Sequence, residues 1–223
     1  MVVARLAPSN VQSGSKKVEL AATAIDMDSK PLGTQRQTLE ISARPERRTQ
    51  PDLHSHLALP PGRYMVRLAA ESEGRTGSVF VDVEVPDFTK DPLSLSGLVL
   101  QLNPAVPVFD KAIASLIPVA PTTVREFSTA DDVSVYLRVY QGGKGRVVPV
   151  RMLASVTSEG NNVTSNQDAV IELGDFGDAR SADYRVTLPL VNLSPGEYLL
   201  EVEAQSGARR LKRSARFTVV SGR

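Results

Sequence analysis

The sequence predicts an all-β protein made of two immunoglobulin-like or fibronectin-like antiparallel β-sandwich domains in tandem. Apolar and polar residues alternate with a period of two in short runs, which Gly, Pro, Asn and Asp separate, while helical periodicity is almost absent. The phrase LPPGRYMVRLAAE, which begins at Leu59, returns as LSPGEYLLEVEAQ from Leu193. This separation is far longer than a hairpin spans, so the repeat indicates two domains of similar construction.

Alternation over Val18 to Ala24 predicts a strand, and the following turn at residues 26–33 is rich in Asp, Pro and Gly. The other strands expected in the first domain are 38–42, 53–59, 64–70 and 78–85. In the second domain we expect strands at 93–102, 133–139, 147–156, 169–173, 184–190, 198–204 and 211–220. The glycines at 142, 143 and 145 suggest that 133–139 and 147–156 form a hairpin.

The boundary between the domains is expected near residues 88–92, where Pro-Asp and Asp-Pro steps interrupt regular structure. The predicted domains are therefore residues 1–88 and 89–223. The stretch 103–123 contains four prolines and little alternation. It predicts an irregular connection within the second domain.

Each copy of the repeated phrase predicts a corner followed by a strand. Pro and Gly fit poorly in a central strand, so they form the corner, and Tyr64 or Tyr198 begins the inward face. A tyrosine at this place is typical of the tyrosine corner of immunoglobulin-like sandwiches, where its hydroxyl bonds nearby backbone. We therefore assign structural roles to Gly62, Tyr64, Gly196 and Tyr198.

Composition argues against several classes of function. Lys plus Arg number 26 and Asp plus Glu 25, and a net charge of +1 does not favour a nucleic-acid partner. The absence of Cys excludes disulfides, thiol catalysis and Cys-ligated zinc. No apolar stretch approaches the length of a membrane span, so no membrane insertion is expected, and the N-terminal residues lack the pattern of an export signal.

Two long segments carry a family resemblance. The run LPPGRYMVRLAAESEGRTGSVFVDVEVPDFTKDPLSLSGLVL and the later run ADYRVTLPLVNLSPGEYLLEVEAQSGARRLKRSARFTV resemble the C-terminal region of bacterial proteins with a von Willebrand factor type A (VWA) related domain. In that family a signal peptide and the A-type domain precede this region. The resemblance therefore implies an exported product, extracellular, periplasmic or at the cell surface, with an upstream A-type domain or another protein as partner.

The metal site of the A-type domain has no counterpart in this chain. That site uses an Asp-x-Ser-x-Ser pattern, because hard cations prefer clustered hydroxyl and carboxylate oxygens. The nearest match, Asp91 with Ser94 and Ser96, has one residue too many between Asp and the first Ser. The family's metal chemistry is therefore not transferred to any residue.

The only histidines, His54 and His56, share one face of an expected strand and could together hold a transition metal. Leu53, Leu57 and Leu59 occupy the other face, so we expect instead two exposed histidines on a polar side. Asp26 and Asp28 could hold calcium, as could the Asp pairs at 131–132 and at 175 and 178, but such residues are typical of plain turns. No metal and no cofactor is predicted.

The remaining candidates concern ligands. Tyr136 and Tyr140 lie on the outer face of one expected strand and are the candidate platform for a carbohydrate. The basic run at 209–216 could bind an anionic polymer, but a solvated strand face explains it more simply. Nothing in the sequence pairs a nucleophile with a base, so we do not expect an enzyme. The predicted function is a non-catalytic spacer or protein-binding region, with a carbohydrate or other surface ligand as the alternative.

Overall fold

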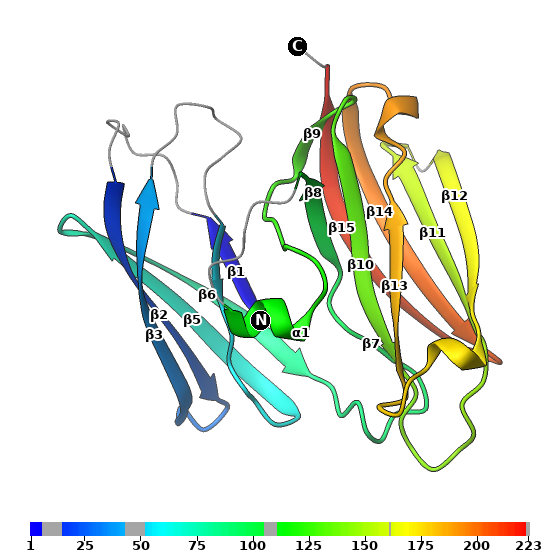
Figure 1. Ribbon diagram of the computed structural model, residues 1–223, viewed down its shortest axis with the longest axis horizontal. Helices are drawn as coiled ribbons and strands as arrows, with labels where there is room; N and C mark the ends of the chain where they lie inside the picture. The colour runs from blue at the N-terminus through cyan, green and yellow to red at the C-terminus, as the bar shows by residue number, and fades with distance from the viewer. Residues whose placement is uncertain (6–14, 43–51, 105–110, 161, 222–223) are drawn as a thin grey trace. The chain divides into compact units, whose positions relative to one another are not determined.

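The computed structural model describes residues 1–5, 15–42, 52–104, 111–160 and 162–221. The chain divides into two compact units. Unit 1 comprises Met1–Asp87 and Val106–Thr123, and unit 2 comprises Phe88–Ala105 and Val124–Arg223. Strands make up nearly all regular structure of the described residues, so the predicted all-β class is confirmed (Figure 1).

Unit 1 is a sandwich of a four-stranded and a two-stranded sheet. The larger sheet has the order β3-β2-β5-β6, and β1 pairs with β4 in the smaller one. All of these pairs are antiparallel. The elements of unit 1 are β1 (Val2–Arg5), β2 (Ser15–Asp26), β3 (Pro31–Ser42), β4 (Asp52–Ser55), β5 (Gly62–Ser72), β6 (Arg75–Val85) and the helix α1 (Lys111–Leu116).

The core of unit 1 follows from the alternation in its strands. Val18, Leu20, Ala22 and Ala24 of β2 are buried in alternation, and the first three pack with Leu53 from β4 and Leu68 from β5. Tyr64 and Val66 form a neighbouring cluster at the start of β5. Each fully buried aliphatic side chain contributes about 1.5–3 kcal/mol relative to an exposed one, so the pattern favours a sandwich.

Unit 2 is a larger sandwich, and Figure 1 shows its two sheets facing one another. One sheet has the order β13-β10-β7, with β8 also paired to β10, and the other has the order β12-β11-β14-β15-β9. Both sheets contribute to one continuous core. The strands of unit 2 are β7 (Ser94–Leu95), β8 (Val99–Asn103), β9 (Glu126–Ser128), β10 (Asp132–Tyr140), β11 (Val150–Ser158), β12 (Val163–Ile171), β13 (Ser181–Thr187), β14 (Gly196–Ser206) and β15 (Arg209–Val220).

The two units share one strand plan. Strands β1 to β6 correspond in order and pairing to β10 to β15, because β1 pairs with β4 as β10 pairs with β13. Gly62 lies opposite Val85 in the β5–β6 hairpin, and Gly196 lies opposite Val219 in the β14–β15 hairpin. Unit 2 adds β7 and β8 beside β10, and β9 beside β15. Among the described residues, β1 and β6 have no such additional neighbours.

The predicted hairpin between 133–139 and 147–156 is wrong. β10 pairs with β13, β7 and β8, whereas β11 pairs with β12 and β14, so the chain crosses from one sheet to the other. The glycines instead allow close backbone packing. The amide of Gly142 donates to the carbonyl oxygen of Asp91 at 2.8 Å, and a Cβ at Gly142 would lie 2.6 Å from the carbonyl carbon of Thr89.

The stretch 103–123 differs from its predicted place in the second domain. Val106–Thr123 groups with unit 1, and it contains the helix α1, which is not among the elements expected from the sequence. Residues 105–110 lie outside the described residues. The short strands β1 and β9 are also absent from the expected strands. β9 runs parallel to the end of β15, with Phe127 opposite Val219.

Candidate functional site

A buried carboxylate in unit 1 joins three segments of the chain. Asp52, at the start of β4, accepts two hydrogen bonds of 3.1 Å from the guanidinium of Arg5 on β1. It also accepts bonds from the hydroxyls of Thr122 and Thr123 and from the amide of Thr123. Only 8% of Asp52 is exposed. We call Asp52 and its partners Arg5, Thr122 and Thr123 the Asp52 network. It connects the smaller sheet to Val106–Thr123, the segment with which the chain returns to unit 1.

Burial and hydrogen bonding act in opposite directions on the pKa of Asp52. Burial disfavours its ionised form, but the bonds from Thr123, Arg5 and Thr122 outweigh burial and lower the pKa of the carboxyl. Asp52 is therefore ionised at neutral pH and fully engaged by neighbouring donors. A carboxylate in this state serves as a structural anchor rather than as a proton donor.

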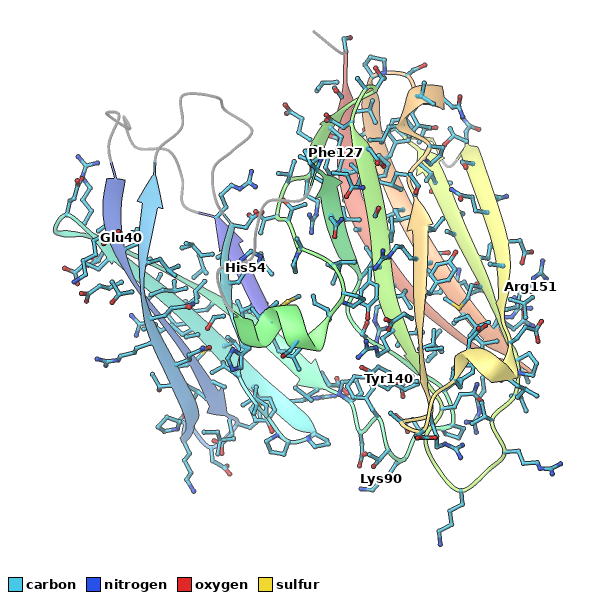
Figure 2. The ribbon with its side chains drawn as sticks, viewed as in Figure 1. Glu40, His54, Lys90, Phe127, Tyr140 and Arg151 are labelled. Atoms are coloured by element: carbon cyan, nitrogen blue, oxygen red, sulfur yellow. The ribbon has the colours of Figure 1, made fainter. Side chains whose placement is uncertain are left out.

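The predicted exposed histidine pair is corrected by the structure. His54 is buried, with 5% exposed, and Figure 2 shows it on unit 1. Its Nε2 lies 3.1 Å from the carbonyl oxygen of Pro121, and its Nδ1 has no hydrogen-bond partner among the described residues. His56 follows β4, and its amide donates to the side chain of Gln35. Both faces of β4 are buried, which is why alternation does not predict exposure there.

The carbohydrate candidates of unit 2 are placed differently from the prediction. Tyr136 is buried, with 1% exposed, and its hydroxyl donates to Asp183 at 2.8 Å. Arg138 donates to the same carboxylate oxygen at 2.6 Å. Burial and the hydrogen bond to Asp183 raise the pKa of Tyr136, while Arg138 and Tyr136 overcome burial to lower the pKa of Asp183. Tyr136 therefore offers no exposed ring face to a sugar.

Tyr140 is only partly exposed and its ring already has an aromatic neighbour. The ring centroids of Tyr140 and Phe88 are 4.2 Å apart, with an interplanar angle of 34°. Tyr140 lies at the end of β10, on the side of unit 2 opposite to Phe127 (Figure 2). The candidate platform of two exposed tyrosines is thus not formed.

Three of the aspartates considered for calcium serve as local caps. One carboxylate oxygen of Asp26 accepts the amides of Asp28 and Lys30, at 3.0 and 2.9 Å. Asp131 accepts the amide of Ser128, and Asp175 accepts the amide of Glu172. Such bonds stabilise turns. Within the described ranges, no group of three His, Asp or Glu side chains is arranged to hold a metal.

The basic run lies on β15, where acidic residues of β14 face it. Lys212 forms ion pairs with Glu201 at 2.6 Å and with Glu203 at 3.3 Å, and Arg210 lies 3.8 Å from Glu203. The cross-strand carboxylates neutralise part of the basic face. This arrangement agrees with the interpretation of the run as a solvated strand face.

Both repeated tyrosines bond the corner that precedes their strand. The hydroxyl of Tyr64 donates to the carbonyl oxygen of Pro60 at 2.7 Å, and that of Tyr198 donates to the carbonyl oxygen of Ser194 at 2.8 Å. Both tyrosines are buried. At Gly62 a Cβ would lie 2.9 Å from the Tyr64 hydroxyl, so a side chain at Gly62 would meet the tyrosine.

No sequence pattern indicated a role for Arg5, Asp52, Thr122, Thr123 or Asp183. Their hydrogen-bond partners lie at least 45 residues away along the chain. A local sequence pattern cannot predict contacts between residues so far apart in the chain. The one signal that could have found Asp52 is its polarity next to a buried apolar residue, Leu53, at the start of a short strand.

Neither a family model nor a curated protein matches the sequence. Among solved structures, the chain is similar to a putative beta-galactosidase from Bacteroides fragilis, with 11% identity and a TM-score of 0.38, over 91% of this chain and 30% of that one. It is similar to dimeric latent PorU from Porphyromonas gingivalis, with 12% identity and a TM-score of 0.36, over 96% and 17%. The chicken interferon gamma receptor alpha chain gives 11% identity and a TM-score of 0.28, over 97% and 91%.

This chain spans less than a third of the first two proteins. At these identities and TM-scores the similarity carries no argument about function, and the fold is established by the strands and registers of this chain. No helix in the described part of the chain is long and apolar enough to cross a membrane.

Proposed function

We propose that the chain is a non-catalytic spacer or protein-binding region of an exported bacterial protein that also carries an A-type domain. The spacer role is supported by one observation above the others. Val106–Thr123 leaves unit 2 and returns to unit 1, so the chain passes between the units three times. A single linker leaves two domains free to reorient, whereas three connections restrict them.

The Asp52 network joins the end of the returning segment to β1 and β4 of unit 1. Arg5, Thr122 and Thr123 bond a buried carboxylate, and the carbonyl oxygen of Pro121 lies beside His54. Bonds to a buried charge contribute about 1.5–3 kcal/mol each in typical proteins. The segment is therefore held by specific interactions as well as by its covalent connections.

The ionisable groups with shifted pKa values also support a structural role. Neighbouring groups form hydrogen bonds with the polar side-chain atoms of Asp52, Asp183 and Tyr136. In an active site such groups would face a substrate. The exported setting and the A-type partner rest on the resemblance of the two quoted segments.

Distance measurements between the units test the spacer role. Because the chain has no Cys, Glu40→Cys in unit 1 and Val163→Cys in unit 2 give two unique sites for spin labels. We expect a narrow distance distribution by pulsed electron paramagnetic resonance, and a broader one when Thr122→Val and Thr123→Val are added. The labelled chain with Thr23→Val, which alters an exposed hydroxyl pair on β2 and β3, is the control. A broad distribution in the unaltered chain would contradict the spacer role.

A further inference from the structure

The outer strand of unit 1 presents an apolar edge to solvent. β6 pairs only with β5 among the described residues, and residues 75–82 are exposed in succession. Val79, Phe80 and Val81 expose 59%, 57% and 49% of their surface. Phe80 lies on the outer face, where the guanidinium of Arg67 lies 5.3 Å from the ring centroid. A long apolar edge strand is a template for pairing with another strand.

The corresponding strand of unit 2, β15, pairs with β9 only at residues 218–220, and the rest of it shows how this chain protects such an edge. The positions of Val79, Phe80 and Val81 on β6 are taken on β15 by Arg213, Ser214 and Ala215, from the shared hairpin register. β15 carries five basic residues over 209–216, and Arg213 reaches across to the carbonyl oxygens of Leu95 and Ser96. Charged side chains on an edge discourage further pairing. From Gly77 to Val81, β6 has no charge.

The outer face of β6 is complementary to itself. Its residues in order are Thr76, Ser78, Phe80, Asp82 and Glu84. When two copies pair antiparallel about Phe80, the two phenylalanines lie opposite each other. Each Ser78 hydroxyl then faces the Asp82 carboxylate of the second copy, and each Thr76 hydroxyl faces a Glu84 carboxylate. No like charges are opposed in this register.

The inner face fits the same register. Val79 of one copy lies opposite Val81 of the other, twice by symmetry, so the four exposed valines cover one another. A shift by two residues, which keeps the same faces together, would place Phe80 opposite Ser78 or Asp82 instead. The pairing about Phe80 is thus the register in which apolar meets apolar and hydroxyl meets carboxylate.

We propose that β6 is a self-association edge, through which two copies of this chain pair antiparallel about a two-fold axis at Phe80. The four-stranded sheet of unit 1 in one copy then continues into the same sheet of the other copy. A two-fold interface uses the same patch on both subunits, which is what the self-complementary sequence of β6 provides. The inference is independent of the spacer role, which concerns the segment Val106–Thr123.

Sedimentation equilibrium of the full chain over a concentration series tests the association. We expect a reversible dimer. Ser78→Asp places a carboxylate opposite Asp82 at two symmetric positions, so it should weaken dimerisation about tenfold. The double variant with Asp82→Ser restores a hydroxyl opposite a carboxylate and should recover the dimer. A chain that stays monomeric at all concentrations would overturn the proposal, and so would a double variant no better than the single one.

Disulfide trapping tests the register, since the chain has no Cys of its own. Phe80→Cys should cross-link two chains under mild oxidation, because only this position faces itself. Val79→Cys and Val81→Cys are the matched controls and should cross-link much more slowly. Faster cross-linking at either control position would overturn the register, and binding of a foreign strand by a strictly monomeric chain would overturn self-association. Circular dichroism of each variant verifies that its fold is retained.

Discussion

The hydroxyl of Tyr64 lies 2.7 Å from the carbonyl oxygen of Pro60 and donates a hydrogen bond to it. Tyr198 makes the same bond to Ser194 in the other unit. In both places a buried side chain fixes the corner from which the penultimate strand of the sandwich starts. The bond therefore has the same expected effect on stability in two different surroundings.

Tyr64→Phe and Tyr198→Phe should each lower the free energy of unfolding by about 1 kcal/mol, because each leaves a carbonyl oxygen without its donor. Urea denaturation followed by circular dichroism measures the change. Tyr184→Phe is the control, since the Tyr184 hydroxyl forms no hydrogen bond with a described residue in unit 2. If neither corner variant changed the free energy of unfolding, the tyrosine hydrogen bonds would not stabilise the domains.

Gly62→Ala should destabilise the chain more than Gly196→Ala does. A Cβ at Gly62 would lie 2.9 Å from the Tyr64 hydroxyl, whereas at Gly196 the nearest atom outside its neighbours is 3.9 Å away, and the two φ angles are nearly equal at +158° and +159°. We expect a difference of about 1 kcal/mol in the free energy of unfolding. The double variant Gly62→Ala with Tyr64→Phe should lose less than the sum of the single changes. Additive losses of stability would show that a Cβ at residue 62 does not press on the Tyr64 hydroxyl.

Asp52→Asn should lower stability at neutral pH by about 2 kcal/mol, because it removes a buried charge from its donors. The pKa of Asp52 is lowered in the folded state from its ordinary value of 3.8. Its ionisation therefore stabilises the fold fully above pH 3.8, and the effect is lost as the pH falls through the lower folded value. Urea unfolding of both chains at a series of pH values should show their difference shrinking in acid. A difference that stays constant with pH would contradict the assignment.

Glu201→Gln with Glu203→Gln should increase retention of the chain on immobilised heparin. These changes remove the carboxylates that face Lys212 and Arg210 on β15. The unaltered chain should elute below physiological salt, because its net charge is only +1. Elution of both chains at the same salt concentration would show that the pairs do not neutralise the strand.

The alternation of apolar and polar residues predicts the sandwich cores well, because burial alone decides which positions in a strand are apolar. Tyr64, Val66 and Leu68 are buried every second residue, and Tyr198, Leu200 and Val202 repeat the pattern. It fails where a strand is short or covered on both faces. β1 has only four residues, and both faces of β4 are buried, so Asp52 and His54 are inside rather than outside.

The candidate site was much less predictable than the fold. Thr123 and Asp52 lie 71 residues apart, and Tyr136 and Asp183 lie 47 apart, so their contacts depend on the tertiary fold. The crossover after β10 resembles a hairpin in sequence, because glycines serve both tight turns and close backbone packing. At Gly142 the neighbouring backbone of Thr89 decides between the two.

The returning segment has a consequence for the order of events during synthesis. Domains generally fold as units from the N-terminus as the chain emerges. Unit 1 cannot be completed in this way, because Asp52 meets Thr122 and Thr123 only after the first strands of unit 2 have been made. Neither unit is a continuous piece of the chain, and a fragment that ends at residue 88 leaves a carboxylate and a histidine without the partners that cover them.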